Sequence, residues 1–276
     1  MASRSITANE AETEIAMFPN WLDLPRDITA NILRRVGTYE IVTSLCEVCS
    51  LWWNICKDPI MWRTIHMTSL WMPPYPNYNL DLVKICCIAI ERSCGHLEDI
   101  DVNSFATDDL LECMANNANN LQYMRLVFCR EISDKKFGDT VRRLPRLEKL
   151  DISYTNISID SLEAIGRSCP LLKSLKFSKM VFKANECDDN VAFVIAETMS
   201  GLCHLDIEGY TFTNVGLLAI IDECPLLESL DIITCDIFDL SQSLKTRCFE
   251  EIKYLRLPFK YTYPNFYNEL FRSRNL

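Results

Sequence analysis

Apolar residues recur at a nearly fixed interval through most of the chain beyond residue 79. The recurring pattern is L-x-x-L-x-L, with conservative apolar replacements, and it occurs seven times. Its starts lie 24, 26, 25, 30, 25 and 25 residues apart, at Leu97, Leu121, Leu147, Leu172, Leu202, Leu227 and Ile252. Chance can supply one or two such matches, but seven in phase predict a chain built from repeated structural units.

Each unit has a second half with a different periodicity. After the apolar pattern comes a turn rich in polar residues, then an amphipathic run in which, for example, Leu162 and Ile165 share one helix face. Cys169-Pro170 and Cys224-Pro225 end two of these runs, because proline cannot continue a helix. A strand–turn–helix unit of this length is typical of leucine-rich repeats. The predicted fold class is α/β, a leucine-rich-repeat horseshoe of about seven strand–helix repeats with parallel strands.

Residues 21–66 carry a different pattern, which predicts three short helices. Pro25 lies at or near the start of the first helix, and Gly37 is expected to end it with a positive φ. The apolar stripe of that helix contains Ile28, Ile32, Leu33 and Val36. Three short helices are too few for a self-sufficient core, so this segment is expected to complete its core on a partner or on the next domain.

Composition and charge exclude several classes of function. The chain has 28 Lys+Arg against 38 Asp+Glu, a net charge of −10, which argues against general binding to nucleic acid. Its seven glycines never stand close enough for a phosphate-binding or nucleophile-elbow loop, and its three histidines form no H-E-x-x-H motif. No signal peptide or membrane-spanning stretch is recognisable, so we expect a reducing location in the cytoplasm and/or nucleus.

The fourteen cysteines are interpreted as packing residues rather than as a disulfide framework or a catalytic centre. Cys94, Cys169 and Cys224 each precede a repeat by three residues, while Cys129 and Cys235 occupy the turn after a strand. Cys46-x-x-Cys49 does not predict a zinc site, since no second ligand pair follows at suitable spacing. We therefore predict no catalytic residues, no metal and no cofactor.

The first segment resembles the F-box proteins. The matching residues span the motif: Leu24-Pro25, the Ile28/Ile32-Leu33/Val36 helix, Leu45, Val48-Cys49, Trp53, Asp58-Pro59 and Trp62-Arg63. Together with the repeats, they make the chain similar to plant F-box/leucine-rich-repeat proteins. The resemblance places an F-box over 19–68. Composition and pattern predict the rest: a disordered N-terminus over 1–18, a Pro-rich linker over 69–79, and repeats over 80–276 that end in an aromatic cap.

The same resemblance implies a function and two partners. F-box proteins of this class are substrate-recognition subunits of Skp–cullin–F-box ubiquitin ligases, without catalysis of their own. The candidates for contact with the Skp-type adaptor are Leu24, Pro25, Ile28, Ile32, Leu33, Ile41, Leu45 and Trp53. Some of these must instead hold the small domain together. The alternative function is a repeat-based interaction scaffold that does not recruit a cullin. Some plant members also bind inositol phosphate and a hormone, but the acidic charge disfavours the basic pocket that this requires.

A substrate protein would bind on the concave face of the repeats. The fifth position of each repeat forms a row across the sheet: Asp101, Arg125, Asp151, Lys176, Asp206, Asp231 and Arg256. Their charges alternate at first and predict either a ladder of cross-strand ion pairs or a binding surface. Asp206 and Asp231 break the alternation and, with Glu208, predict an acidic patch for a basic segment of the substrate. Third-position residues add possible contacts: Tyr123, His204 and Tyr254.

The longest spacing, between Leu172 and Leu202, is filled by an insertion at residues 183–190. Repeat insertions usually emerge as loops at one edge of the array. Two interpretations are open for this one: a solvated acidic loop, or a loop that contacts the substrate.

Overall fold

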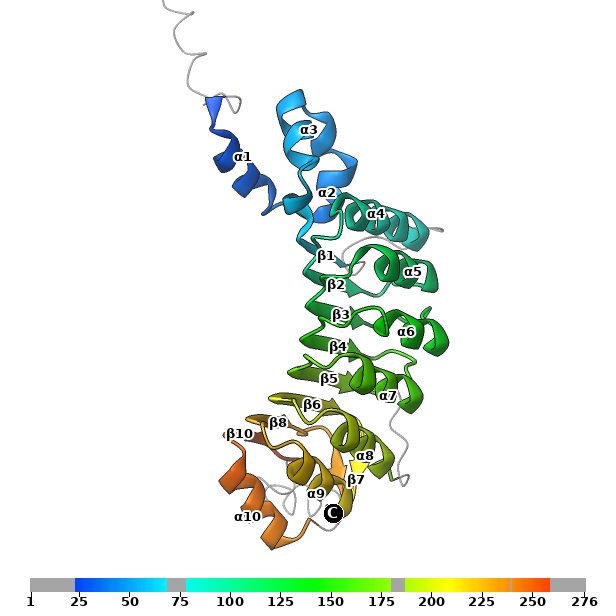
Figure 1. Cartoon of the computed structure of the whole chain (residues 1–276), viewed down its shortest axis with the longest axis vertical. Coiled ribbons are helices and arrows are strands. Elements are labelled where there is room, and N and C mark those ends of the chain that lie inside the picture. Colours follow the sequence, from blue (N-terminus) through cyan, green and yellow to red (C-terminus); the bar gives the residue numbers. More distant parts are fainter. Residues whose placement is uncertain (1–22, 69–77, 180–186, 239, 259–276) are drawn as a thin grey trace, which may run out of the picture.

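A computed structural model describes residues 23–68, 78–179, 187–238 and 240–258 (Figure 1). The predicted disordered N-terminus, most of the predicted linker and the predicted aromatic cap lie outside the described residues. Helix α4 begins at Tyr78, inside the range predicted as linker.

The repeats form one parallel sheet of eight strands in the order β1-β2-β3-β4-β5-β6-β8-β10. Each of the seven predicted repeats contributes a strand that begins two residues after the start of its apolar pattern. The strands are β1 (Thr64–Thr68), β2 (Asp99–Asn103), β3 (Tyr123–Val127), β4 (Lys149–Ser153), β5 (Ser174–Ser178), β6 (His204–Glu208), β8 (Ser229–Asp231) and β10 (Tyr254–Arg256). A separate two-stranded sheet pairs β7 (Thr211–Phe212) with β9 (Asp236–Ile237).

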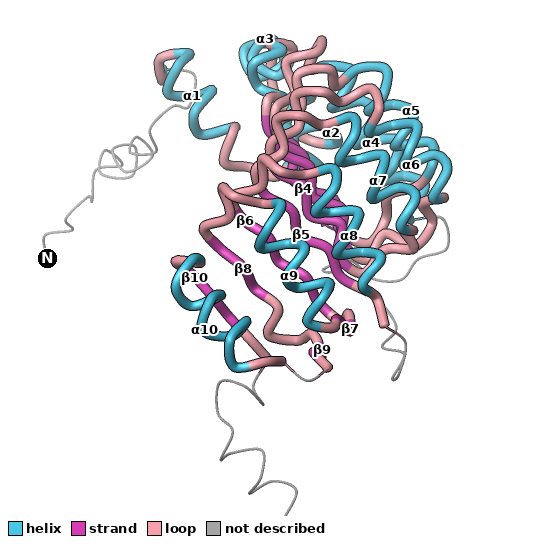
Figure 2. Tube along the Cα trace, turned by 60° about the horizontal axis from the view of Figure 1, so that its bottom comes forward, coloured by secondary structure: helices cyan, strands magenta, loops and turns pink. Residues whose placement is uncertain are grey.

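Helices cover one face of the large sheet, and the other face is left open (Figures 1 and 2). They are α4 (Tyr78–Arg92), α5 (Asp108–Asn117), α6 (Asp134–Val141), α7 (Ile159–Ser168), α8 (Asp189–Thr198), α9 (Asn214–Glu223) and α10 (Gln242–Glu251). The pattern leucines explain this arrangement, because residues such as Leu97, Ile100 and Val102 are fully buried between sheet and helices. The predicted α/β repeat architecture is confirmed.

The N-terminal segment consists of short helices: α1 (Arg26–Leu33), α2 (Thr38–Thr43), η2 (Leu45–Glu47), α3 (Ser50–Cys56) and η3 (Pro59–Trp62). Helix α1 begins directly after Pro25, as predicted. The expectation for Gly37 is wrong, since its φ is −63° and it caps the start of α2. Helix-like backbone bonds from Arg35 to Ile32 and from Val36 to Leu33 close the end of α1 without a left-handed residue.

An additional strand joins the two halves of the molecule. Strand β1 follows η3 without a break and pairs in parallel with β2. Trp62, Ile65 and Met67 occupy the three apolar positions of a repeat in this register, and all three are buried. The residue that closes the helical segment therefore also opens the first repeat.

One hydrophobic core runs through both halves. Leu33, Ile41 and Trp62 belong to the same buried cluster as the repeat leucines. Arg92, at the end of α4, lies 5.5 Å from the centre of the Trp62 ring and donates to the Cys46 thiol over 3.4 Å. The small helical segment thus completes its core on the repeats, which is one of the two outcomes expected from its size.

Carboxylates at the starts of helices link successive repeats. Asp108 accepts hydrogen bonds from the backbone and hydroxyl of Ser133 at 2.7 and 2.6 Å. Asp134 does the same with Ser158, at 2.7 and 2.8 Å, and Asp189 accepts from the backbone and hydroxyl of Thr213. In each case the donor is the residue that caps the next helix, so one carboxylate fixes the start of its neighbour.

Replacing Asp134 with alanine should lower the free energy of unfolding by about 1–2 kcal/mol, because the Ser158 donors lose their acceptor. Burial would raise the pKa of the Asp134 carboxyl, but hydrogen bonds from Ser158 and Ser161 outweigh it and lower the pKa below its ordinary 3.8. The difference from wild type should therefore be present at neutral pH and shrink as the pH falls below 3.8. Urea denaturation at several pH values measures this; an equal loss in Asp139→Ala, an exposed residue of the same helix, would contradict it.

The cysteines mostly follow the packing interpretation. All fourteen are free thiols, and Cys129, Cys169, Cys224 and Cys235 are buried. The Cys235 thiol donates to the Ile207 carbonyl over 3.1 Å, in the turn position expected for it. Cys94 is an exception, because it is exposed: it has φ 47° in the turn that ends α4.

Candidate binding surfaces

The candidate adaptor contacts of the helical segment differ in solvent exposure. Pro25, Ile28 and Trp53 are exposed, the last two by 43% and 40%. Leu24, Ile32 and Leu45 are half-buried. Leu33 and Ile41 are only 1% and 5% exposed. These two are therefore corrected from surface candidates to core residues of this chain, since they pack against the segment's own helices and the repeats.

The same segment exposes two apolar side chains that were not among the predicted contacts. Val48 follows η2 and is 58% exposed, while Ile60 in η3 is 48% exposed. Val48 lies three residues after Leu45, at helical spacing, and is among the residues that carry the F-box resemblance, whereas periodicity does not single out Ile60 in the short helix η3. Lys57 places its ammonium 4.6 Å from the centre of the Trp53 ring, so this tryptophan combines an apolar body with a cationic neighbour.

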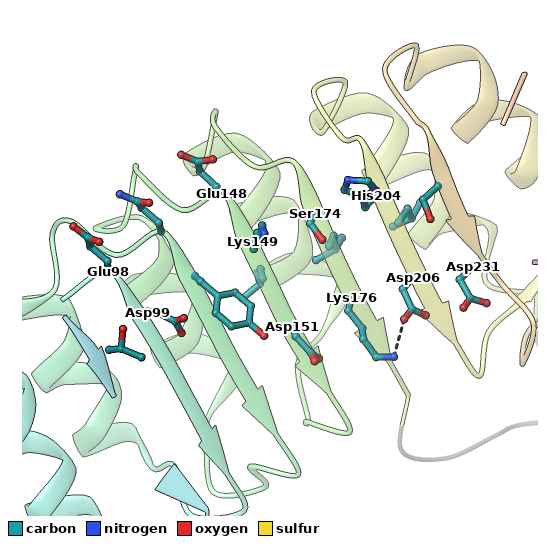
Figure 3. A pocket seen from close by; sticks show the side chains of 17 residues that line it. Glu98, Asp99, Glu148, Lys149, Asp151, Ser174, Lys176, His204, Asp206 and Asp231 are labelled. Carbon is teal, nitrogen blue, oxygen red and sulfur yellow. Dashed lines mark hydrogen bonds and ion pairs between the residues drawn. The ribbon is translucent and has the colours of Figure 1, made fainter. Parts of the chain in front are cut away.

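The open face of the large sheet carries a polar groove of about 910 Å³ (Figure 3). Six predicted substrate contacts line it: Tyr123, Asp151, Lys176, His204, Asp206 and Asp231. Arg125, Glu208 and Tyr254 are not part of its lining. Arg125 and Glu208 are instead held in ion pairs beside the groove, and Tyr254 is 58% exposed on strand β10.

The groove also includes residues from the second and third repeat positions that sequence reasoning missed. Examples are Glu98, Asp99, Gln122, Glu148, Lys149 and Ser174. For Asp99, Lys149 and Ser174 the signal was present, because alternate residues of a strand share a face and the third position faces the same side as the fifth. Glu98, Gln122 and Glu148 precede their strands, so this alternation does not predict them. At the third position, substrate contacts are predicted from the sequence only for tyrosine and histidine residues.

Fifth-position charges form the predicted cross-strand ladder. The Arg125 guanidinium bonds to Asp101 at 2.8 Å and to Asp151 at 3.1 Å. The Lys176 ammonium bonds to Asp206 at 2.7 Å, and Arg256 bonds to Asp231 at 2.6 Å. The strands pair these residues directly, so the ladder follows from the parallel register.

The predicted acidic patch is present but largely compensated. Asp206 and Asp231 are direct neighbours in the sheet. Burial raises the pKa of Asp206, and the nearby carboxylates of Asp231 and Glu208 add to the rise against the opposing effect of Lys176. Lys176 also bonds Glu208 at 2.6 Å, and Arg256 bonds Asp231. Three carboxylates against two cations leave a net charge of −1, less than the sequence suggests.

The added strand β1 extends the ladder by one residue. His66 occupies its fifth position, paired with Asp101 in register, and its Nε2 lies 3.2 Å from Asp99. The hydrogen bond to Asp99 is the main cause of a raised pKa for His66, reinforced by the charges of Asp99 and Asp101 against the lowering effect of burial. When protonated, His66 continues the alternation at the end nearest the helical segment.

The insertion between repeats is described only from residue 187 onward. There Asp188 pairs with Lys179 at 2.5 Å and accepts from the Thr211 backbone at 2.9 Å. Asp189 holds the start of helix α9 through Thr213. These two acids order the neighbouring repeat, so they do not form the solvated loop that was one interpretation; the rest of the insertion lies outside the described residues.

Metal ligands and membrane segments were also sought. In the described ranges, no group of three or more His, Cys, Asp or Glu side chains is placed to hold a metal ion. None of the helices described is both long and apolar enough to span a membrane.

Comparison with known proteins identifies both halves. Residues 21–68 match the family described as F-box-like. Over 258 residues the chain is 41% identical to F-box protein SKIP19 of Arabidopsis thaliana, covering 94% of this chain and 83% of that protein. It is 42% identical over 242 residues to Putative F-box/LRR-repeat protein 23 of the same plant, covering 87% of this chain but 53% of that protein.

A solved structure has a similar fold. The crystal structure of a Rad7 and Elc1 complex in yeast aligns with a TM-score of 0.53 at 13% identity. The alignment covers 75% of this chain and 50% of that one. At this identity the similarity concerns the fold alone.

Proposed function

Because the chain belongs to the F-box/leucine-rich-repeat proteins, we propose that it is the substrate-recognition subunit of a Skp–cullin–F-box type ubiquitin ligase. The helical segment binds a Skp-type adaptor, and the open face of the repeats binds the protein to be ubiquitinated. The observation that carries this proposal is the F-box match over residues 21–68, in a segment that still exposes large apolar side chains.

The exposed apolar residues supply a driving force for adaptor binding. Ile28, Val48, Trp53 and Ile60 are each 40–58% exposed although their segment is small. Covering such side chains removes apolar area from water, and a partly exposed tryptophan is a frequent centre of binding energy. These residues, rather than Leu33 and Ile41, are the proposed adaptor contacts.

In this proposal the chain contributes binding and proximity, and the ligase's other subunits carry the ubiquitin chemistry. The repeat cysteines support this division. Burial raises the pKa of the Cys169 thiol to about 12 and is the main cause of a pKa of about 12 for Cys235. Both thiols stay protonated at neutral pH, whereas a cysteine that forms thioesters needs an accessible thiolate.

We propose that the complex acts in the cytoplasm or nucleus.

Two matched variants test the division of labour. The double variant Ile28→Asp, Trp53→Ala should weaken capture of a purified Skp-type adaptor by about 30-fold or more, because a binding hot spot contributes ~2 kcal/mol or more. The double variant Asp206→Asn, Asp231→Asn should retain full adaptor capture, since those residues lie on strands β6 and β8. It should instead weaken capture of substrate by the repeats.

Calorimetry with purified adaptor measures the first effect, and copurification of a cullin with the complex distinguishes a ligase subunit from a scaffold. Unchanged adaptor affinity in the Ile28 and Trp53 variant would reject the proposed surface. Adaptor binding without cullin would favour the interaction scaffold.

A further inference from the structure

Two aromatic side chains stack at the carboxyl edge of the sheet. Phe128 directly follows strand β3, and Tyr154 directly follows β4. Their ring centres lie 4.7 Å apart and their planes differ by 7°. Phe128 is nevertheless 41% exposed. The chain thus holds a large apolar ring at its surface in a defined orientation.

The backbone at both positions is unfavourable for these residues. Phe128 has φ 56° and Tyr154 has φ 57°, in the left-handed region. The equivalent position in two other repeats is also left-handed, with Ser104 at φ 73° and Gly209 at φ 80°. The turns of these four repeats share this conformation, and Gly209 adopts it without the penalty of a side chain. An aromatic residue there is costly for folding, which points to another use.

Tyr154 fixes the pair on the open face of the sheet. Its hydroxyl donates a hydrogen bond to the Glu208 carboxylate over 2.6 Å, and Glu208 bonds Lys176 beside the groove. That hydrogen bond is the main cause of a raised pKa for Tyr154. The tyrosine ring is held by this bond on one side of the stack, so Phe128 presents its other side to the preceding repeat.

The preceding repeat carries a small side chain at the equivalent position, beside the exposed Phe128 ring. Neighbouring strands lie about 4.8 Å apart, which matches the 4.7 Å spacing of the two rings. The next place in the stack is that of Ser104, whose side chain is a single hydroxymethyl group. A flat group inserted there would contact Phe128 at stacking distance.

Charge favours a cation in this place over an aromatic ring. On strands β2, β3 and β4, which adjoin this place, Asp101 and Asp151 share one cation, Arg125. With His66 counted as neutral, two carboxylates against one cation give a local net charge of −1, in a chain whose net charge is −10. A guanidinium is both planar and cationic, and it stacks on aromatic faces.

We propose that Phe128 and Tyr154 form a platform on which an arginine side chain of the bound substrate protein stacks. This inference rests on the proposed function in one respect, that the repeats bind a protein. It adds the residue type that they recognise and the two side chains that recognise it.

The test uses random peptides displayed on phage and selected on the purified full chain. Selected peptides should be enriched in arginine. Replacing that arginine with citrulline, which is equally planar but neutral, should weaken binding by about two- to fivefold, the equivalent of an exposed cation–π contact. On the Phe128→Gly variant the two peptides should bind equally, whereas the Phe249→Ala control, an exposed phenylalanine of helix α10, should behave as wild type.

The outcomes separate this inference from folding and from the proposed function. Glycine suits φ 56°, so Phe128→Gly should keep a denaturation midpoint close to wild type, and Phe128→Asn provides a second variant that tolerates this backbone. Three outcomes would contradict the platform. They are selected peptides without arginine, a selection that yields no binding peptide, and an equal effect of citrulline on the wild type and on Phe128→Gly. Adaptor affinity is measured on the same samples as a separate test of the F-box proposal. It should be unchanged in the Phe128 variants, whatever the peptides show.

Discussion

The Trp62→Ala variant should lose about 3–5 kcal/mol of unfolding free energy, as expected for truncation of a large buried aromatic residue. Trp62 is 1% exposed, donates from Nε1 to the Cys56 carbonyl at 2.9 Å and lies beneath the Arg92 guanidinium. It belongs to the helical segment through η3 and to the sheet through β1. Its removal should therefore loosen both halves where they meet.

Chemical denaturation followed by circular dichroism measures the loss, and hydrogen exchange locates it. Protection should fall first in residues 23–68, while the distant strands β5 and β6 keep theirs. Trp53→Ala is the matched control, because that tryptophan is 40% exposed and should cost far less. Comparable losses in the two variants would show that Trp62 has no special role at the junction.

The Lys176→Met variant should be less stable than wild type by about 1–2 kcal/mol at neutral pH, a value reduced for the 34% exposure of the lysine side chain. Lys176 bonds both Asp206 and Glu208. Burial works to raise the pKa of Glu208, but bonds from Lys176 and Tyr154 lower it below 4.5. Without the lysine, Asp206 and Glu208 lose their shared cationic partner, and the pKa of both carboxyl groups should rise.

The stability difference between Lys176→Met and wild type should depend on pH. In the variant, the folded state binds protons more readily than the unfolded state, so its stability relative to wild type should recover as the pH falls through the carboxyl range near 4. Urea denaturation between pH 7 and pH 3 measures the recovery. Lys149→Met is the control, since Lys149 lines the same groove and is exposed. A deficit that persists at low pH would indicate lost packing rather than lost charge pairing.

Sequence patterning predicts the repeats well, because every repeat must bury the same positions. Leu150 and Leu175 illustrate this, with exposures of 2% and 1%. The pattern misses β1 because a tryptophan replaces the first leucine and 35 residues, rather than about 25, separate Trp62 from Leu97. The extra length comes from the Pro-rich segment, which lies between β1 and the helix of the same unit.

The binding surfaces are less predictable, because they depend on contacts between residues far apart in the chain. A helical stripe contains both Leu33 and Ile28, and only the packed structure shows that the first is buried and the second exposed. The acidic patch was overestimated since Lys176 reaches diagonally to Glu208, two residues beyond its direct partner Asp206. The carboxylate links between repeats also escaped prediction, as each joins residues about one repeat apart.

Under the proposed function, strand β1 has a consequence for how a captured protein is held relative to the other subunits of the ligase. A flexible tether would let the two ends of the molecule point in many directions. Here the connection is a hydrogen-bonded strand of the same sheet, so each further repeat advances by about 4.8 Å along one continuous body. If the proposed function holds, the number of repeats sets which lysines of the captured protein come within reach of ubiquitin transfer.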